Sequence, residues 1–278
     1  LGHAGLMDAR VSEALKASSR SRIGNDVMDL RHHRCRGRRR DDPLLGRILS
    51  SGERDWLDAT ATEELWSIRL WALWAAKEAA FKVHSKLSSL GPFLPRRFSC
   101  QLETDIAPNG TGVRIWGRVS CSDSETPVTI EGSANRNYVH VVGWSGAAER
   151  PSGSRLEVGL EELEEVGLEG SGEKLEALES HFSAAEWKGI YSLHSARARL
   201  LAREGIRVHL CPGPGNQLGS RDEVIEIRTT GDRPGQGPPQ VWFGGREVDN
   251  LDFSLSHHGR FVAWALLLPE PGWRARGI

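Results

Sequence analysis

Apolar side chains recur every three or four residues between about residues 63 and 86, the spacing that places them on one face of an α-helix. The apolar stripe consists of Trp66, Leu70, Leu73, Ala76, Ala80, Val83 and Leu87. A second helix is predicted over about residues 184–204. Ser50, followed three residues later by Glu53, has the pattern of a capping box and predicts a short helix before the long one.

Strands are predicted in both parts of the chain. Residues 21–30 read as a first strand, and the segments 137–144 and 260–267 are comparable apolar strands that end the two parts. Aligning those last two strands places Ser133 opposite Ser256. This repeat supports two similar α+β halves.

A change of composition separates the two halves. From Ser145 to about Lys174 the chain is rich in Gly, Ser and Glu, which is typical of a linker. We therefore expect five segments. They are an N-terminal arm at 1–20, a first half at 21–145, an acidic linker at 146–178, a second half at 179–270 and a C-terminal tail at 271–278.

Composition is that of a soluble enzyme. A length of 278 residues with 38% hydrophobic residues is enough for a core, and a net charge of −1 creates no overall field for nucleic acid or membrane. Residues 1–20 lack the apolar core of a signal peptide, so we expect a cytoplasmic protein. The four cysteines are scattered, which favours reduced thiols over a zinc site or a disulfide framework.

The most informative segment is Trp74–Lys82, within the predicted long helix. Glu78 and Lys82 share a face that points away from the apolar stripe, and Lys77 lies at the edge of that stripe. One interpretation is an exposed salt bridge on a surface helix. The other is a carboxylate that holds a metal beside lysines that hold phosphate.

The first predicted strand carries a second carboxylate, Asp26, two residues after Gly24. Glycine permits close approach of the backbone to a neighbour. An Asp and a Glu from separate elements, together with phosphate oxygens and water, are the usual ligands of Mg²⁺.

These segments resemble the 4′-phosphopantetheinyl transferases, whose signature is a G-x-D strand followed by a helix with W/F-x-x-K-E-x-x-x-K. The chain has IGNDVMDL and LWAAKEAAFK in that order. Its LSSGE segment is similar to the L-T-x-x-E stretch of holo-acyl-carrier-protein synthases. Near the C-terminus, DFSLSHHG is similar to the F-N-x-S-H strand of the larger family type, and GDRP resembles that type's G-K/R-P element with one inserted residue.

The order of these motifs is permuted, because in the larger type the nucleotide-binding motifs come first. A permuted order is tolerable if each half is a similar α+β unit. The resemblance therefore implies an α+β pseudo-dimer with the active site between a metal- and phosphate-binding half and a coenzyme A nucleotide-binding half.

The implied reaction is the Mg²⁺-dependent transfer of 4′-phosphopantetheine from coenzyme A to a serine of an acyl or peptidyl carrier protein. By this resemblance Asp26 and Glu78 bind the metal, and Glu78 and Lys82 are catalytic. Asp29 is a further candidate ligand or base. The residues implied in binding coenzyme A are Lys77, Lys82, Arg233, Ser256 and His257.

The segment Arg31–Arg40 contains six arginines. The resemblance implies that it docks the acidic helix of the carrier protein, and the alternative is a solvated basic loop. Two other functions stay open: a non-catalytic homologue that binds coenzyme A or a carrier, and an arginine-rich nucleic-acid-binding module. We expect a monomer that binds neither membrane nor nucleic acid.

Overall fold

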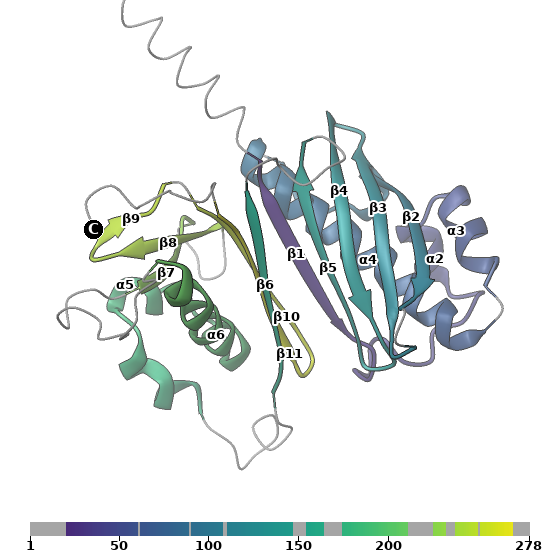
Figure 1. The fold of residues 1–278 in the computed structure, drawn as a ribbon. Coiled ribbons are helices and arrows are strands. Elements are labelled where there is room, and N and C mark those ends of the chain that lie inside the picture. The colour runs from purple at the N-terminus through teal and green to yellow at the C-terminus, as the bar shows by residue number, and fades with distance from the viewer. Residues whose placement is uncertain are drawn as a thin grey trace, which may run out of the picture.

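The computed structural model confirms the α+β class, with antiparallel sheets and packed helices (Figure 1). It describes residues 21–60, 62–88, 90–107, 110–146, 154–163, 174–210, 225–231, 237–249 and 251–268, with the side chains of residues 209 and 210 excepted. The expected arm at 1–20, the tail at 271–278 and the candidate Arg233 lie outside the described residues.

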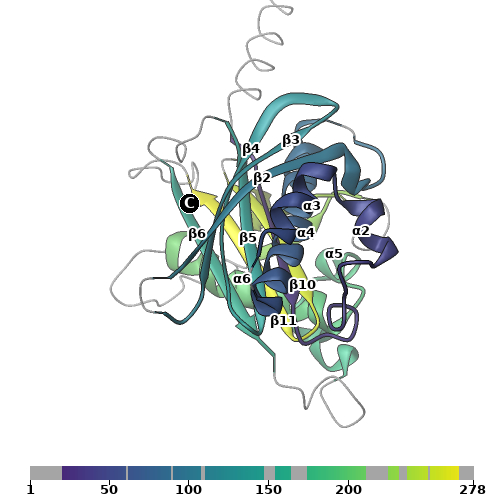
Figure 2. The ribbon, with the colours of Figure 1, turned by 90° about the vertical axis from the view of Figure 1, so that its right-hand side faces the viewer.

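The first half is a five-stranded antiparallel sheet in the order β1-β5-β4-β3-β2. Its strands are β1 (Ile23–Asp29), β2 (Phe98–Ile106), β3 (Val113–Cys121), β4 (Ser124–Ala134) and β5 (Tyr138–Ser145). The helices of this half are α2 (Pro43–Ile48), α3 (Ser51–Asp58) and α4 (Glu63–Leu87), with a 3₁₀ turn η1 (Pro95–Arg97) before β2. Figures 1 and 2 show α4 crossing one face of the sheet, with α2 and α3 beside it.

The long helix predicted over 63–86 is confirmed as α4. Thr62 caps its first turn by accepting a hydrogen bond from the Leu65 N–H. The predicted capping box is also present in α3, where Ser50 and Glu53 bind each other's backbone N–H groups. No helix in the described part of the chain combines the length and apolar character needed to cross a membrane.

The second half contains a three-stranded sheet in the order β10-β11-β6 and a small sheet in the order β7-β8-β9. The strands are β6 (Arg155–Glu162), β7 (Ile225–Thr229), β8 (Pro239–Phe243), β9 (Arg246–Glu247), β10 (Asp252–His258) and β11 (Phe261–Leu268). Its helices are η3 (Leu175–His181), α5 (Ala184–Trp187) and α6 (Leu193–Leu210). Figure 1 shows α6 beside this sheet, whose strands lie between α6 and β1.

Two local expectations need correction. The helix predicted over 184–204 is two helices, because the chain turns at Gly189, whose N–H binds the Glu186 carbonyl. Within the expected linker, residues 155–162 form a strand, β6. This strand pairs antiparallel with the edge of β11 and packs Leu156 and Leu160 against the interface between the halves.

The two halves meet along β1 through a ladder of side chains. Strand β1 is an edge of its sheet, so its outward N–H groups need partners from elsewhere. Every second residue of β10 supplies one of these partners. The backbone N–H groups of Ile23, Asn25, Val27 and Asp29 bind the side chains of Asp252, Ser254, Ser256 and His258, respectively. The ladder sets the register of one half on the other.

Candidate active site

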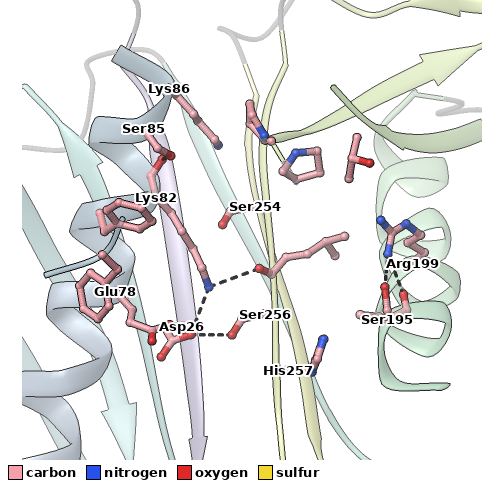
Figure 3. A pocket seen from close by; sticks show the side chains of 18 of the residues that line it. Asp26, Glu78, Lys82, Ser85, Lys86, Ser195, Arg199, Ser254, Ser256 and His257 are labelled. Atoms are coloured by element: carbon pink, nitrogen blue, oxygen red, sulfur yellow. Dashed lines mark hydrogen bonds and ion pairs between the residues drawn. The ribbon is translucent and has the colours of Figure 1, made fainter. Parts of the chain in front are cut away.

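A cavity of about 620 Å³ lies between the two halves. Figure 3 shows Glu78, Lys82 and Lys86 of α4 on one side and Ser195 and Arg199 of α6 on the other. Asp26 of β1 and the side chains of β10 line the cavity between the helices. Both halves therefore contribute to one candidate site.

Asp26 lies on β1 two residues beyond Gly24, where the strand packs closely on α4. A Cβ added at Gly24 would stand 2.1 Å from the Ala79 carbonyl oxygen, so only glycine allows this spacing. The Oδ1 atom of Asp26 accepts hydrogen bonds from Lys82 Nζ at 3.1 Å and from Ser256 Oγ at 2.7 Å. Its Oδ2 atom is buried and has no hydrogen-bond partner among the described residues.

Glu78 is the second carboxylate of the site. Burial raises its pKa to about 8, and the neighbouring charge of Asp26 acts in the same direction. The Lys82 ammonium and a hydrogen bond from Trp74 oppose the shift. Two carboxylates held this close repel each other unless a proton or a cation lies between them.

The donor set fits a magnesium ion with few protein ligands. Asp26 and Glu78 come from separate elements. No nitrogen or hydroxyl donor among the described residues binds the buried Oδ2 atom of Asp26, and the neighbouring Glu78 carboxyl can share either a proton or a cation with Asp26. Within the described residues, no group of three or more His, Cys, Asp or Glu side chains could hold a metal. Two carboxylates therefore leave most coordination positions to substrate oxygens and water.

Lys82 and Lys86, one helical turn apart, connect α4 to both halves. Lys82 Nζ binds the Asn25 carbonyl at 2.7 Å as well as Asp26, and its side chain remains 28% exposed toward the cavity. Lys86 Nζ is almost fully buried between the carbonyls of Ile23 and Phe253 and the Asp252 carboxylate. Lys86 is not among the residues predicted from the sequence, although its i+4 spacing from Lys82 places it on the same helix face.

The opposite end of the cavity is built from the second half. His257 Nε2 lies 3.0 Å from the Tyr191 hydroxyl. The His194 ring stacks on the His257 ring, with ring centroids 5.7 Å apart. Burial lowers the pKa of His257 to about 4, and the charges of His194 and Lys82 add to this effect. His257 is therefore neutral at physiological pH.

Arg199 also lines this end, and it too was not singled out from the sequence. Its guanidinium binds Ser195 Oγ and the carbonyls of Gly189 and Ile227. These contacts join α6 to the loop before it and to β7. Only the tertiary structure brings Arg199 to the cavity.

Comparison with known proteins bears on the first half. Residues 22–135 match the family model described as the 4'-phosphopantetheinyl transferase superfamily. The match spans Asp26, Glu78 and Lys82 and stops before β5. A search of curated proteins returned no match.

One residue of the transferase motif lies away from the cavity. We expected Lys77 to contact phosphate, but its ammonium is buried and binds Glu53 at 2.8 Å together with the carbonyls of Ile48, Pro95 and Phe98. All its donor capacity is used inside the first half. The capping-box residue Glu53 is its ionic partner.

Asp29 is likewise engaged elsewhere. Both of its oxygens bind Arg260, which follows β10. Burial alone would raise the pKa of Asp29, but the hydrogen bonds from Arg260 and Arg31 outweigh it and lower the pKa. Asp29 thus joins the two halves, and it is not among the residues that line the cavity.

The basic segment Arg31–Arg40 follows β1 directly. Arg36 and Arg39 are exposed, whereas Arg38 binds Asp42 at 2.8 Å. The His32 ring meets that of His258 edge-on, with centroids 4.7 Å apart. The segment therefore begins next to β10, at the end that carries His257.

Proposed function

We propose that the chain transfers 4′-phosphopantetheine from coenzyme A to a serine of an acyl or peptidyl carrier protein, in the manner of a holo-acyl-carrier-protein synthase. The observation that carries the proposal is the facing pair of carboxylates, Asp26 and Glu78, beside the ammonium of Lys82 in a cavity between the halves. These residues lie in the region that matches the transferase superfamily.

The residues suit attack by a hydroxyl on a pyrophosphate. Asp26 and Glu78 would hold Mg²⁺, which when bound neutralises charge on the pyrophosphate oxygens. Lys82 reaches the same place and would contact phosphate as a point charge. Glu78 lines the cavity beside Asp26 and Lys82, and with a bound cation to favour its carboxylate form it would be placed to take the serine proton directly or through water.

The proposed reaction is a substitution at phosphorus, in which one bond forms and one bond breaks at the same atom. The serine oxygen forms a bond to the β-phosphorus of coenzyme A, and the bond from that phosphorus to the bridging oxygen breaks. The products are the holo-carrier and adenosine 3′,5′-bisphosphate, and the serine proton passes to Glu78.

The nucleotide end of coenzyme A would extend toward the second half. The side chains of His257 and Tyr191 face the cavity there, and a neutral His257 can donate one hydrogen bond to a phosphate oxygen. We propose that the first half, 21–145, binds metal and phosphate and that the second, 179–270, binds the nucleotide. The two halves would act as a pseudo-dimer within a single chain, so a monomer would be complete.

Docking of the carrier protein is assigned to Arg31–Arg40. The segment with the exposed arginines follows directly after β1, the strand whose Asp26 lines the cavity. Carrier proteins present an acidic helix beside the target serine. Opposite charges at the rim of an interface mainly accelerate encounter.

Mass spectrometry of apo carrier proteins incubated with the chain, coenzyme A and Mg²⁺ tests this function. We expect a mass gain of one phosphopantetheine on at least one carrier from fatty acid, polyketide or peptide synthesis. The gain should disappear with a Ser→Ala carrier, with chelator, and with Glu78→Gln. Binding of coenzyme A without a mass gain on any carrier would instead indicate a non-catalytic homologue.

A further inference from the structure

Ser256 uses its hydroxyl group entirely on β1. Its oxygen accepts the Val27 N–H at 3.1 Å, and its only proton is donated to Asp26 Oδ1 at 2.7 Å. The side chain is buried, with 5% of its surface exposed. A serine has one donor, so Ser256 in this arrangement has none left for a nucleotide phosphate.

The contact with Asp26 orients a carboxylate whose terminal rotation is otherwise soft. Two donors, Ser256 Oγ and Lys82 Nζ, bind the same oxygen, Oδ1. The other oxygen, Oδ2, is left buried without a hydrogen-bond partner in the described part of the chain. The donors of Ser256 and Lys82 are thus kept off this second oxygen, so a cation shared with Glu78 can bind there.

The register of the two strands delivers Ser256 to this place. In the ladder between β10 and β1, Ser254 accepts the Asn25 N–H at 3.0 Å, just as Ser256 accepts the Val27 N–H. Among the described residues Ser254 makes no hydrogen bond to Asp26, whereas Ser256 does. The chain thus contains two serines with the same structural task, of which one touches the carboxylate.

We propose that Ser256 is a positioning residue for the cation site: the second half orients the carboxylate of the first through this hydroxyl. The inference rests on the proposed function for the presence of a cation at Asp26. It replaces the role in nucleotide binding that the sequence resemblance implied for Ser256. Docking of the two halves and assembly of the cation site become one event.

Electron paramagnetic resonance with Mn²⁺, measured on the purified full chain with and without coenzyme A, tests this role without turnover. Ser256→Ala should weaken Mn²⁺ affinity by about 10- to 100-fold, the usual effect of removing a hydrogen bond to a ligand. Ser254→Ala is the matched control. It should lower the urea midpoint as much as Ser256→Ala does, with less than about a twofold change in Mn²⁺ affinity.

The outcomes separate this inference from the proposed function. If the wild-type chain binds no Mn²⁺ even with coenzyme A, the proposed metal-dependent function fails. If the wild type binds Mn²⁺ and Ser256→Ala binds it equally well, the positioning role alone is wrong. A larger loss for coenzyme A than for dephospho-coenzyme A in Ser256→Ala would return Ser256 to the nucleotide site.

If Ser256→Ala fails to fold, Ser256→Cys provides a second test of the same role. A thiol fills a similar space and is a weaker donor, so we expect an intermediate loss of Mn²⁺ affinity. Wild-type affinity in a folded Ser256→Cys chain would contradict the proposal.

Discussion

At the scale of single residues, adjacent side chains of one motif have separate tasks. Lys77 and Glu78 follow each other on α4, so they point to different sides of the helix. Glu78 faces the cavity, whereas Lys77 points into the core of the first half, where Glu53 and three carbonyls surround its ammonium. The motif K-E thus joins a structural ion pair to a candidate catalytic carboxylate.

Lys77→Met should therefore act on stability. It leaves the buried Glu53 without its cation, and we expect the free energy of unfolding to fall by about 3–5 kcal/mol in urea titrations. The double variant Lys77→Met/Glu53→Gln should recover part of this loss. An unchanged unfolding midpoint combined with weaker coenzyme A binding would show instead that Lys77 contacts phosphate.

Burial of His140 makes the free energy of unfolding depend on pH. It is buried on β5 beside the Asn25 amide, and burial lowers its pKa to about 4; the Asp26 charge opposes this shift and Lys82 supports it. Arg114 and Glu131 lie in the same groove. Because the unfolded histidine has a pKa near 6.5, the unfolded chain binds a proton that the native chain rejects between about pH 6.5 and 4.

The free energy of unfolding should therefore fall as the pH is lowered through this window, by on the order of 3 kcal/mol from His140. Urea titrations of the wild type and His140→Gln at several pH values measure the contribution, since other histidines titrate in both proteins. The variant should lose less stability between pH 6.5 and 4. Parallel curves for the two proteins would contradict the prediction.

At the scale of elements, the site depends on how closely α4 lies on β1. The contact between Gly24 and the Ala79 carbonyl fixes the separation of the helix from the strand. Asp26 is two residues beyond Gly24 on the strand, and Glu78 directly precedes Ala79 on the helix. The spacing of the backbones therefore sets the spacing of the two carboxylates.

Gly24→Ala should push the two elements apart. We expect a loss of about 1–3 kcal/mol in the free energy of unfolding, together with weaker Mn²⁺ binding. Gly52→Ala in α3 is the control, because a Cβ there meets nothing within 4 Å. If a destabilised Gly24→Ala chain kept the wild-type Mn²⁺ affinity, the spacing of the two carboxylates would not depend on this backbone contact.

At the scale of the whole molecule, the halves are joined by polar and apolar contacts. The side-chain ladder on β1 and the ion pair of Asp29 with Arg260 flank apolar clusters that include Val27, Phe261 and Leu160. A shift of one half along the other would leave the N–H groups of β1 buried without partners, which is costly. The ladder therefore favours one docking position. The basic segment then lies at a constant place relative to the cavity.

Reversing two exposed arginines of that segment, Arg36→Glu with Arg39→Glu, should raise the KM for carrier protein about tenfold. This corresponds to about 1.4 kcal/mol for two rim charges, with little change in the KM for coenzyme A. The wild-type rate at low carrier concentration should also fall as salt rises. Arg118→Glu on β3 is the control, exposed on a different element. An unchanged KM for carrier would make Arg31–Arg40 a solvated loop.

The local elements and the principal carboxylates could be predicted from the amino-acid sequence. The periodicity of α4, the capping box of α3 and the strand around Asp26 depend on neighbours a few residues away, so they are readable from spacing. The motif also indicated Glu78 and Lys82, because their helical spacing places them on one face.

The side chains that meet across the two halves could not be predicted from the sequence, because they are far apart in the chain. Asp29 and Arg260 are 231 residues apart, and Ser256 is 230 residues from Asp26. No local pattern shows that β10 lies against the edge of β1, or that Glu53 takes Lys77 out of the cavity. Buried polar groups need hydrogen-bond partners. The partners named here are found only when the two halves pack together, which is a later step than the formation of single helices and strands.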